Sequence, residues 1–369
     1  MPVPMTPYRR GATTLDSVRP MTDALELAWF AALCDDDYEQ LGVIDPSLSS
    51  SYEHCADIVH AADDAGFDAI LMPSGYALGI DTIAFTAAVA RSTRRIRPIV
   101  AVRTGEVWAP QLARQLATLD QLLHGRMVVN IISSELPGES LASAPRYART
   151  LEHMRALRTL LSGRSLEGGG DWVDVRVDPP RVRTVSGQCP PLYFGGLSDD
   201  ARDVAASEAD VYLMWPDTMP NVEAILADMR TRAAAYGRTL RFGYRVHVVV
   251  RPTETEAREA ARHLMAALDP DIGAAIRAKS LDSGSVGVIA QTALRDAADD
   301  DGFVEPHLWT GIGRARSGCG AAIVGDPQQV AEKIRTYQAL GIDTFVLSGY
   351  PHLHECRRFA ELVMPLLRA

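Results

Sequence analysis

The stretch LGIDTFVLSGYPH (residues 340–352) lies near the end of the chain, and a similar stretch, AGFDAILMPSGYA (65–77), lies near its beginning. In both, a Gly is followed by an apolar residue, an Asp and a short apolar run that leads into Ser-Gly-Tyr. A Gly after a helical pattern is a common helix end, and a short apolar run between turn residues is typical of a buried strand. We therefore interpret each stretch as a helix end, a strand and a loop, although common βα patterning alone also explains the similarity.

Apolar runs of this kind alternate with helical patterns from residue 25 onward. They predict eight strands, at 25–33, 67–72, 96–103, 127–133, 190–196, 210–215, 242–251 and 344–350. Strands that alternate with helices predict an α/β fold with a parallel sheet, and eight of them favour closure into a (β/α)8 TIM barrel. In such a barrel the active site is built at the C-terminal ends of the strands.

The length of the chain bounds its domain organisation. No segment of linker composition divides the sequence, so we expect a loosely ordered arm over residues 1–24 and a single domain over 25–369. A TIM barrel needs about 250 residues, and the excess predicts insertions. The main one is a long irregular lid at about 269–325, before the last strand, and a hairpin is expected at 167–185.

Composition excludes several classes of function. The net charge is −10 and no Lys/Arg-rich run occurs, which argues against nucleic acid or a membrane surface as the partner. The five cysteines show no C-x-x-C spacing, so neither a metal site nor a disulfide framework is expected. The first 20 residues lack a signal peptide and no 18-residue apolar run occurs, so we expect a cytoplasmic protein.

Several polar residues fall at the predicted strand ends. The turn GGLS (195–198) precedes a helix, whose free N–H groups could bind a phosphate, although an ordinary helix cap is the commoner reason for such a turn. Arg245 and His247 are two apart on one strand and therefore share a face. The sequence contains no G-x-S-x-G, H-E-x-x-H or Walker motif, so the chemistry is expected to belong to a bound cofactor.

The chain resembles the bacterial-luciferase-like flavin monooxygenases, and within them the alkanesulfonate monooxygenases. The resemblance lies in ARQLATLDQLLHGR (113–126), PPLYFGGLSDDA (190–201), RFGYRVHVVVR (241–251), SGCGAAIVGDPQQVAEKI (317–334) and LGIDTFVLSGYPHLHE (340–355). It implies a two-component system in which an NAD(P)H-dependent FMN reductase supplies reduced FMN (FMNH2). With O2, the enzyme would cleave the C–S bond of a small anionic organosulfonate to give an aldehyde and sulfite. A homodimer or homotetramer is also implied.

The same resemblance implies roles for individual residues. The implied catalytic residues are Arg245, His247, Arg316 and Tyr350, with Arg316 on a mobile lid. The implied cofactor-binding residues are Asn130, Arg146, Tyr147, Gly195, Gly196, Ser198 and Trp215. The substrate pocket is expected to contain Cys34, Tyr76, Glu106 and Trp108, because they lie at predicted strand ends.

The chain departs from the family pattern at four strand ends. Cys34 stands where the family has a His, SGYALGIDT (74–82) lacks a family Cys, ISSELPGE (132–139) replaces a Thr-Gly, and RTGEVW (103–108) introduces Glu106 and Trp108. Three alternatives to a sulfonate monooxygenase therefore stay open. They are a monooxygenase for another substrate, a deazaflavin (F420)-dependent oxidoreductase and a non-catalytic flavin-binding protein.

Overall fold

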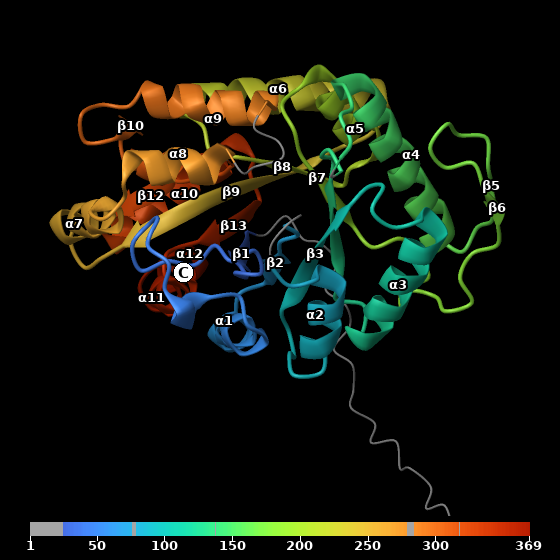
Figure 1. Ribbon diagram of the computed structural model, residues 1–369, viewed down its shortest axis with the longest axis horizontal. Coiled ribbons are helices and arrows are strands. Elements are labelled where there is room, and N and C mark those ends of the chain that lie inside the picture. Colours follow the sequence, from blue (N-terminus) through green and yellow to red (C-terminus); the bar gives the residue numbers. More distant parts are fainter. Residues whose placement is uncertain (1–24, 76–78, 137, 279–283, 317) are drawn as a thin grey trace, which may run out of the picture.

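The computed structural model of the protein describes residues 25–75, 79–136, 138–278, 284–316 and 318–369 (Figure 1). The predicted arm at 1–24 and the candidate residue Tyr76 lie outside the described residues.

Eight parallel strands form a closed barrel. They are β1 (Glu26–Phe30), β2 (Ala69–Met72), β3 (Arg97–Arg103), β4 (Val128–Ile132), β7 (Leu192–Phe194), β8 (Val211–Met214), β9 (Arg241–Val250) and β13 (Thr344–Ser348). Their order around the barrel is β1-β2-β3-β4-β7-β8-β9-β13, and β13 pairs with β1 to close the ring. The predicted (β/α)8 TIM barrel is confirmed, and each strand overlaps its predicted range.

Helices cover the outside of the barrel. They are α1 (Tyr52–Ala65), α2 (Thr82–Val89), α3 (Ala109–Leu122), α4 (Ser143–Leu161), α5 (Asp199–Glu208), α6 (Met219–Ala235), α7 (Glu254–Met265), α10 (Pro327–Leu340), α11 (His352–Leu362) and α12 (Met364–Arg368). Gly66 ends α1 with a φ of 84°, and Gly341 ends α10 with a φ of 109°. Both values lie in the left-handed region that favours glycine. The similar stretches at 65–77 and 340–352 therefore each contain a helix end and a strand.

Alternate residues of the strands face the barrel interior, as the two-residue period of a strand requires. The middle of this interior is an apolar layer of Ala28, Phe30, Ala69, Leu71, Ile99, Val128, Tyr193, Val211 and Val346. Below it, at the N-terminal ends of the strands, buried Glu26 lies 2.9 Å from Arg97 and 3.7 Å from Arg241. This ionic layer is far from the strand ends where sites form, so we assign it to stability.

The insertion before the last strand is regular rather than irregular, which corrects the sequence-based expectation. It contains α8 (Pro270–Ala278), α9 (Val286–Asp296), β10 (Phe303–Glu305), β11 (Leu308–Trp309), a short 3-10 helix (Gly311–Arg314) and β12 (Ala322–Gly325). β12 pairs with the second half of β9, whose ten residues reach beyond the barrel. The predicted hairpin is present as β5 (Leu166–Glu167) and β6 (Arg176–Val177).

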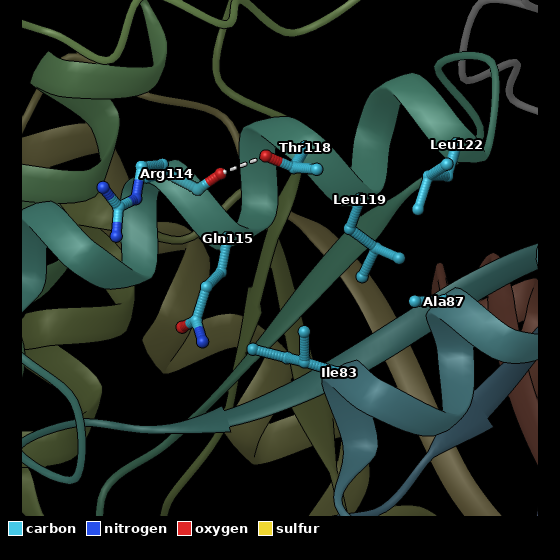
Figure 2. A pocket seen from close by; sticks show the side chains of 7 residues that line it. All are labelled: Ile83, Ala87, Arg114, Gln115, Thr118, Leu119 and Leu122. Atoms are coloured by element: carbon cyan, nitrogen blue, oxygen red, sulfur yellow. Dashed lines mark hydrogen bonds between the residues drawn. The ribbon is translucent and has the colours of Figure 1, made fainter.

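A shallow groove lies on the outer surface between α2 and α3 (Figure 2). Its volume is about 260 Å³, and it is lined by Ile83, Ala87, Arg114, Gln115, Thr118, Leu119 and Leu122. The Oε1 atom of Gln115 is buried there without a hydrogen-bond partner in the described part of the chain. Within that same part, no helix is long and apolar enough to cross a membrane.

Candidate active site

A cavity of about 720 Å³ opens at the C-terminal ends of the barrel strands. This volume is typical of a cofactor or small-molecule site, which ranges over about 300–1,000 Å³. The candidate residues that line it are Cys34, Asn130, Arg146, Tyr147, Gly195, Gly196, Ser198, Trp215, Arg245 and Arg316. Glu106, Trp108, His247 and Tyr350 are described but do not line it.

One end of the cavity is formed by the start of α5. Ser198 caps this helix, because its Oγ accepts a hydrogen bond from the Ala201 N–H at 3.2 Å. The other N–H groups of a first helical turn have no partner within the helix, and the helix dipole adds positive charge there. A Cβ placed on Gly196 would lie 2.7 Å from Cβ of Ala201, so the turn packs closely only with a glycine. This end of the cavity suits an anionic group such as phosphate.

The first turn of α4 adds a cation to the same end. α4 starts at Ser143, so Arg146 and Tyr147 lie at the start of this helix. The guanidinium of Arg146 lies 5.1 Å from the centre of the Tyr147 ring. The Ser143 hydroxyl donates to Asp200 on α5 at 2.5 Å and joins the two helix starts.

The side of the cavity formed by β9 and the insertion carries two further arginines. The Arg245 guanidinium is 3% exposed and lies 4.3 Å from the centre of the Phe30 ring. Its Nη1 donates to the carbonyls of Val246 and Val346 at 3.2 and 3.5 Å, and its Nη2 has no partner among the described residues. Burial lowers the pKa of Arg245. The free protein thus holds a poorly compensated cation, which an anionic ligand would stabilise.

Arg316 reaches the same place from the insertion. Its Nη1 donates to Asp36 at 2.8 Å and to the Tyr350 hydroxyl at 2.7 Å. Burial alone would lower the pKa of Arg316, but Tyr350 and Asp36 raise it well above its ordinary value. For Asp36, burial acts to raise the pKa, but the charges of Arg316, His352 and Arg245 and the hydrogen bond from Arg316 together outweigh it, so the net pKa is lowered. Both partners are therefore ionised at neutral pH.

His247 and Tyr350 lie together just outside the cavity lining. Their rings stack with centres 5.1 Å apart, and the Ser348 hydroxyl lies 2.7 Å from Nδ1 of His247. Burial, reinforced by the charge of Arg245, lowers the pKa of His247 well below 6.5. Burial also raises the pKa of Tyr350. A neutral imidazole and a protonated phenol therefore stand beside the arginines.

Cys34 lines the cavity as a thiol. Burial, with a contribution from Asp36, raises its pKa to about 12. A thiolate is the reactive form of cysteine, so the structure gives no support for Cys34 as a nucleophile.

The insertion packs on Trp215, which follows β8. Cβ atoms placed on Gly287 and Gly318 would lie 3.0 and 3.3 Å from the Trp215 ring. The Gln291 amide donates to the Pro216 carbonyl at 2.7 Å and its Oε1 accepts from the Gly320 N–H at 3.2 Å. The insertion therefore closes directly over the rim of the cavity.

Two buried arginines that sequence reasoning missed organise the loops after β2, β3 and β4. Arg103 donates to Glu106 at 2.8 Å, to the Ser74 carbonyl at 3.3 Å and to the Ser134 hydroxyl. Arg149 donates to the Ser134 carbonyl at 3.0 Å and to Glu139 at 2.8 Å. Glu106 thus forms an ion pair with Arg103 outside the cavity lining. Trp108 is 61% exposed. The signal for Arg103 was available, because it ends a strand as a polar residue.

Asp36 was also missed, although the sequence contains its signal. The acidic run Asp35–Asp37 follows the first strand directly, which places it at the functional end of a barrel. Its partner Arg316 lies 280 positions away, so the pairing itself cannot be read from local sequence.

Comparisons with known proteins agree with this geometry. A sequence model of the luciferase-like monooxygenases matches residues 27–344. The sulfoquinovose monooxygenase of Novosphingobium aromaticivorans is 61% identical over 347 residues, which make up 92% of this chain and 96% of that protein. The sulfoquinovose monooxygenase of Agrobacterium fabrum is 49% identical over 349 residues, 94% of this chain and 90% of that protein.

A solved structure shares the fold. The EDTA monooxygenase from Chelativorans sp. BNC1 superposes with a TM-score of 0.75 at 20% identity, over 94% of this chain and 93% of that one. The family match covers well over half of the sequence. The matched residues form most of the barrel and of the cavity lining. This protein belongs to the luciferase-like monooxygenase family.

Proposed function

We propose that this protein is a two-component FMNH2-dependent monooxygenase that cleaves the C–S bond of a sugar sulfonate such as sulfoquinovose, giving an aldehyde and sulfite. The observation that carries the proposal is the buried, poorly compensated Arg245 beside Arg316, which suits a sulfonate. Paired donors of guanidinium groups match the oxygen atoms of such an anion. The two relatives named as sulfoquinovose monooxygenases, at 61% and 49% identity, support the substrate class.

The residues present fit reduced FMN. The phosphate would bind the start of α5 at Gly195, Gly196 and Ser198, with Arg146 as the counter-charge. Tyr147, Asn130 and Trp215 also line the cavity and would hold the rest of the cofactor. When bound, reduced flavin supplies the two electrons that activate O2.

The remaining candidate residues divide the other tasks. Arg245 and Arg316 would orient the sulfonate, and Arg316 would also keep the insertion closed so that water is excluded. Tyr350, a protonated phenol, can donate a hydrogen bond, and His247, a neutral imidazole, can accept a proton. Both lie next to Arg245 rather than in the cavity wall, so they would act at its edge. Substrate-pocket roles for Cys34, Tyr76, Glu106 and Trp108 stay predictions.

The partners proposed are O2 and a separate NAD(P)H-dependent FMN reductase, in the cytoplasm. We also propose a homodimer or homotetramer that assembles through the outer face of α2 and α3. In support, α2 carries no charged residue, and helices that are apolar on all sides are normally buried. The groove in Figure 2 would then be covered by a second copy. Light scattering that finds a monomer at micromolar concentration would contradict this part.

The proposal is tested by a panel of sulfonates supplied with a flavin reductase, NADH, FMN and O2. Sulfoquinovose, methanesulfonate, octanesulfonate and a benzenesulfonate would be compared by released sulfite. We expect sulfite from sulfoquinovose, with glucose as a control that gives none. If only a substrate that is not a sulfonate is oxygenated, the sulfonate substrate class is wrong, while the monooxygenase activity stands. Substrate oxidation without O2 uptake would instead support the deazaflavin alternative.

A further inference from the structure

Asp36 is an acidic residue in the wall of a cavity that is otherwise suited to an anion. It lies in the loop after β1 and lines the cavity, with 15% of its side chain exposed. Its Oδ2 accepts the hydrogen bond from Arg316 at 2.8 Å. Its Oδ1 is buried and has no hydrogen-bond partner among the described residues.

A buried oxygen without a partner is unfavourable, and in native structures such atoms normally find a partner. An ionised carboxylate can only accept hydrogen bonds, and the lowered pKa of Asp36 keeps it ionised. Sulfonate oxygens are acceptors as well, so they cannot satisfy Oδ1. The partner must be a hydrogen-bond donor, which a substrate hydroxyl group supplies when it displaces water from the cavity.

Nη2 of Arg245, which lines the same side of the cavity, is a donor without a partner among the described residues. Nε2 of His247 and both ring nitrogens of His352, outside the cavity lining, also have no partner among those residues. The Arg245 charge is close enough to Asp36 to contribute to lowering its pKa. One side of the cavity thus offers an acceptor and a donor that the protein leaves unpaired. A ligand that carries an anionic acceptor and a hydroxyl donor close together satisfies both, whereas a simple alkanesulfonate satisfies only Arg245.

We propose that Asp36 is a specificity-determining residue that accepts a hydrogen bond from a substrate hydroxyl group while Arg245 and Arg316 hold the sulfonate. The inference rests on the proposed function, since it takes a sulfonate as the anion. It assigns the preference for hydroxylated sulfonates over alkanesulfonates to one carboxylate oxygen. Sites built to pair with a substrate hydroxyl discriminate strongly against analogues that lack it, because the buried group is then left unpaired.

The test compares two probes of similar size, sulfoquinovose and cyclohexylmethanesulfonate, which lacks hydroxyl groups. Their dissociation constants are measured anaerobically with the enzyme saturated with reduced FMN, and the ratio of the two constants is the readout. Asp36→Ala should weaken sulfoquinovose binding about 10- to 100-fold more than cyclohexylmethanesulfonate binding. Asp36→Asn keeps the size of the side chain and an acceptor oxygen, so it should give an intermediate ratio. Circular dichroism checks that each variant is folded.

Tyr350→Phe is the matched control. It removes the other hydrogen bond to Arg316, at 2.7 Å, but leaves Asp36 in place. It should weaken both probes by the same factor and keep the ratio of the wild-type enzyme. If Asp36→Ala and Asp36→Asn also leave the ratio unchanged, Asp36 acts only through Arg316 and the inference is wrong.

The outcome separates this inference from the proposed function. Wild-type enzyme that binds sulfoquinovose but releases no sulfite contradicts the proposed function, while the binding ratio still decides the role of Asp36. Sulfite release with an unchanged ratio in both Asp36 variants contradicts the inference alone. Failure of wild-type enzyme to bind either probe contradicts both.

Discussion

Replacing Arg245 with Met should make the free protein more stable while it removes the binding of an anion. The guanidinium is 3% exposed, its two hydrogen bonds to carbonyls measure 3.2 and 3.5 Å, and its Nη2 is unpaired. Removing a guanidinium from water costs several kcal/mol. The hydrogen bonds of Arg245 and its contact with Phe30 each offset about 1–2 kcal/mol of this cost at most. Met has a similar length and also packs favourably on an aromatic ring. We expect the free energy of unfolding to rise by about 1–2 kcal/mol.

The assay is urea unfolding followed by tryptophan fluorescence, with and without sulfoquinovose. A ligand at 100 times its dissociation constant stabilises the wild-type protein by about 2.7 kcal/mol, and the variant should lose most of this gain. Arg251→Met is the control, because Arg251 pairs with buried Glu355 at 3.2 Å and its removal should destabilise the protein. An Arg245→Met protein that is less stable than wild type, or equally stabilised by the ligand, would refute this reasoning.

Three further predictions concern the ionic groups. Glu26→Gln should lower the free energy of unfolding by about 3 kcal/mol, because Arg97 loses its buried partner, while Arg241 keeps its ion pair with Asp343 at 2.8 Å. It should leave the KM for the sulfonate unchanged; urea unfolding and steady-state kinetics measure the two effects. Arg316→Ala should abolish turnover yet preserve the dissociation constant for FMN, because Arg316 lies apart from the α5 end of the cavity. A fluorescence titration that shows lost FMN binding would argue against this prediction. Stability should also fall as pH drops from about 7 to 5, because burial lowers the pKa of three imidazoles below their unfolded value of about 6.5. The unfolded chain then binds more protons, which favours unfolding by up to about 1.4 kcal/mol per pH unit for each imidazole. The urea midpoint at pH 7.5 and 5.5 measures the combined effect of these residues, which are His153, His247 and His352.

The barrel could be predicted because its signals are local. An apolar run forms a strand wherever it is buried, and a glycine that follows a helix supplies the left-handed conformation that ends it, as Gly66 and Gly341 do. The cap of α5 by Ser198 follows from the same kind of signal. These features depend on neighbours in sequence, so one sequence suffices to find them.

The contacts that shape the cavity depend on distant residues and could not be predicted in this way. Arg316 meets Asp36 across 280 positions, and Arg103 joins loops that follow three different strands. The strand β12 was missed because AIVG is short and becomes a strand only by pairing with the overhanging end of β9. Each of these features requires the closed barrel to exist first.

In the proposed function, O2 consumption is coupled to the cleavage of a sulfonate. The most direct measurement is the ratio of sulfite released to O2 consumed, with sulfoquinovose in excess, reduced FMN supplied by a reductase and O2 limiting. One O2 oxidises one C–S bond, while reduced flavin supplies two electrons and the second oxygen atom leaves as water. This predicts a ratio that approaches one after subtraction of the O2 consumed by free reduced FMN. O2 consumption no faster than that of free reduced FMN, with no sulfite released, would contradict the account.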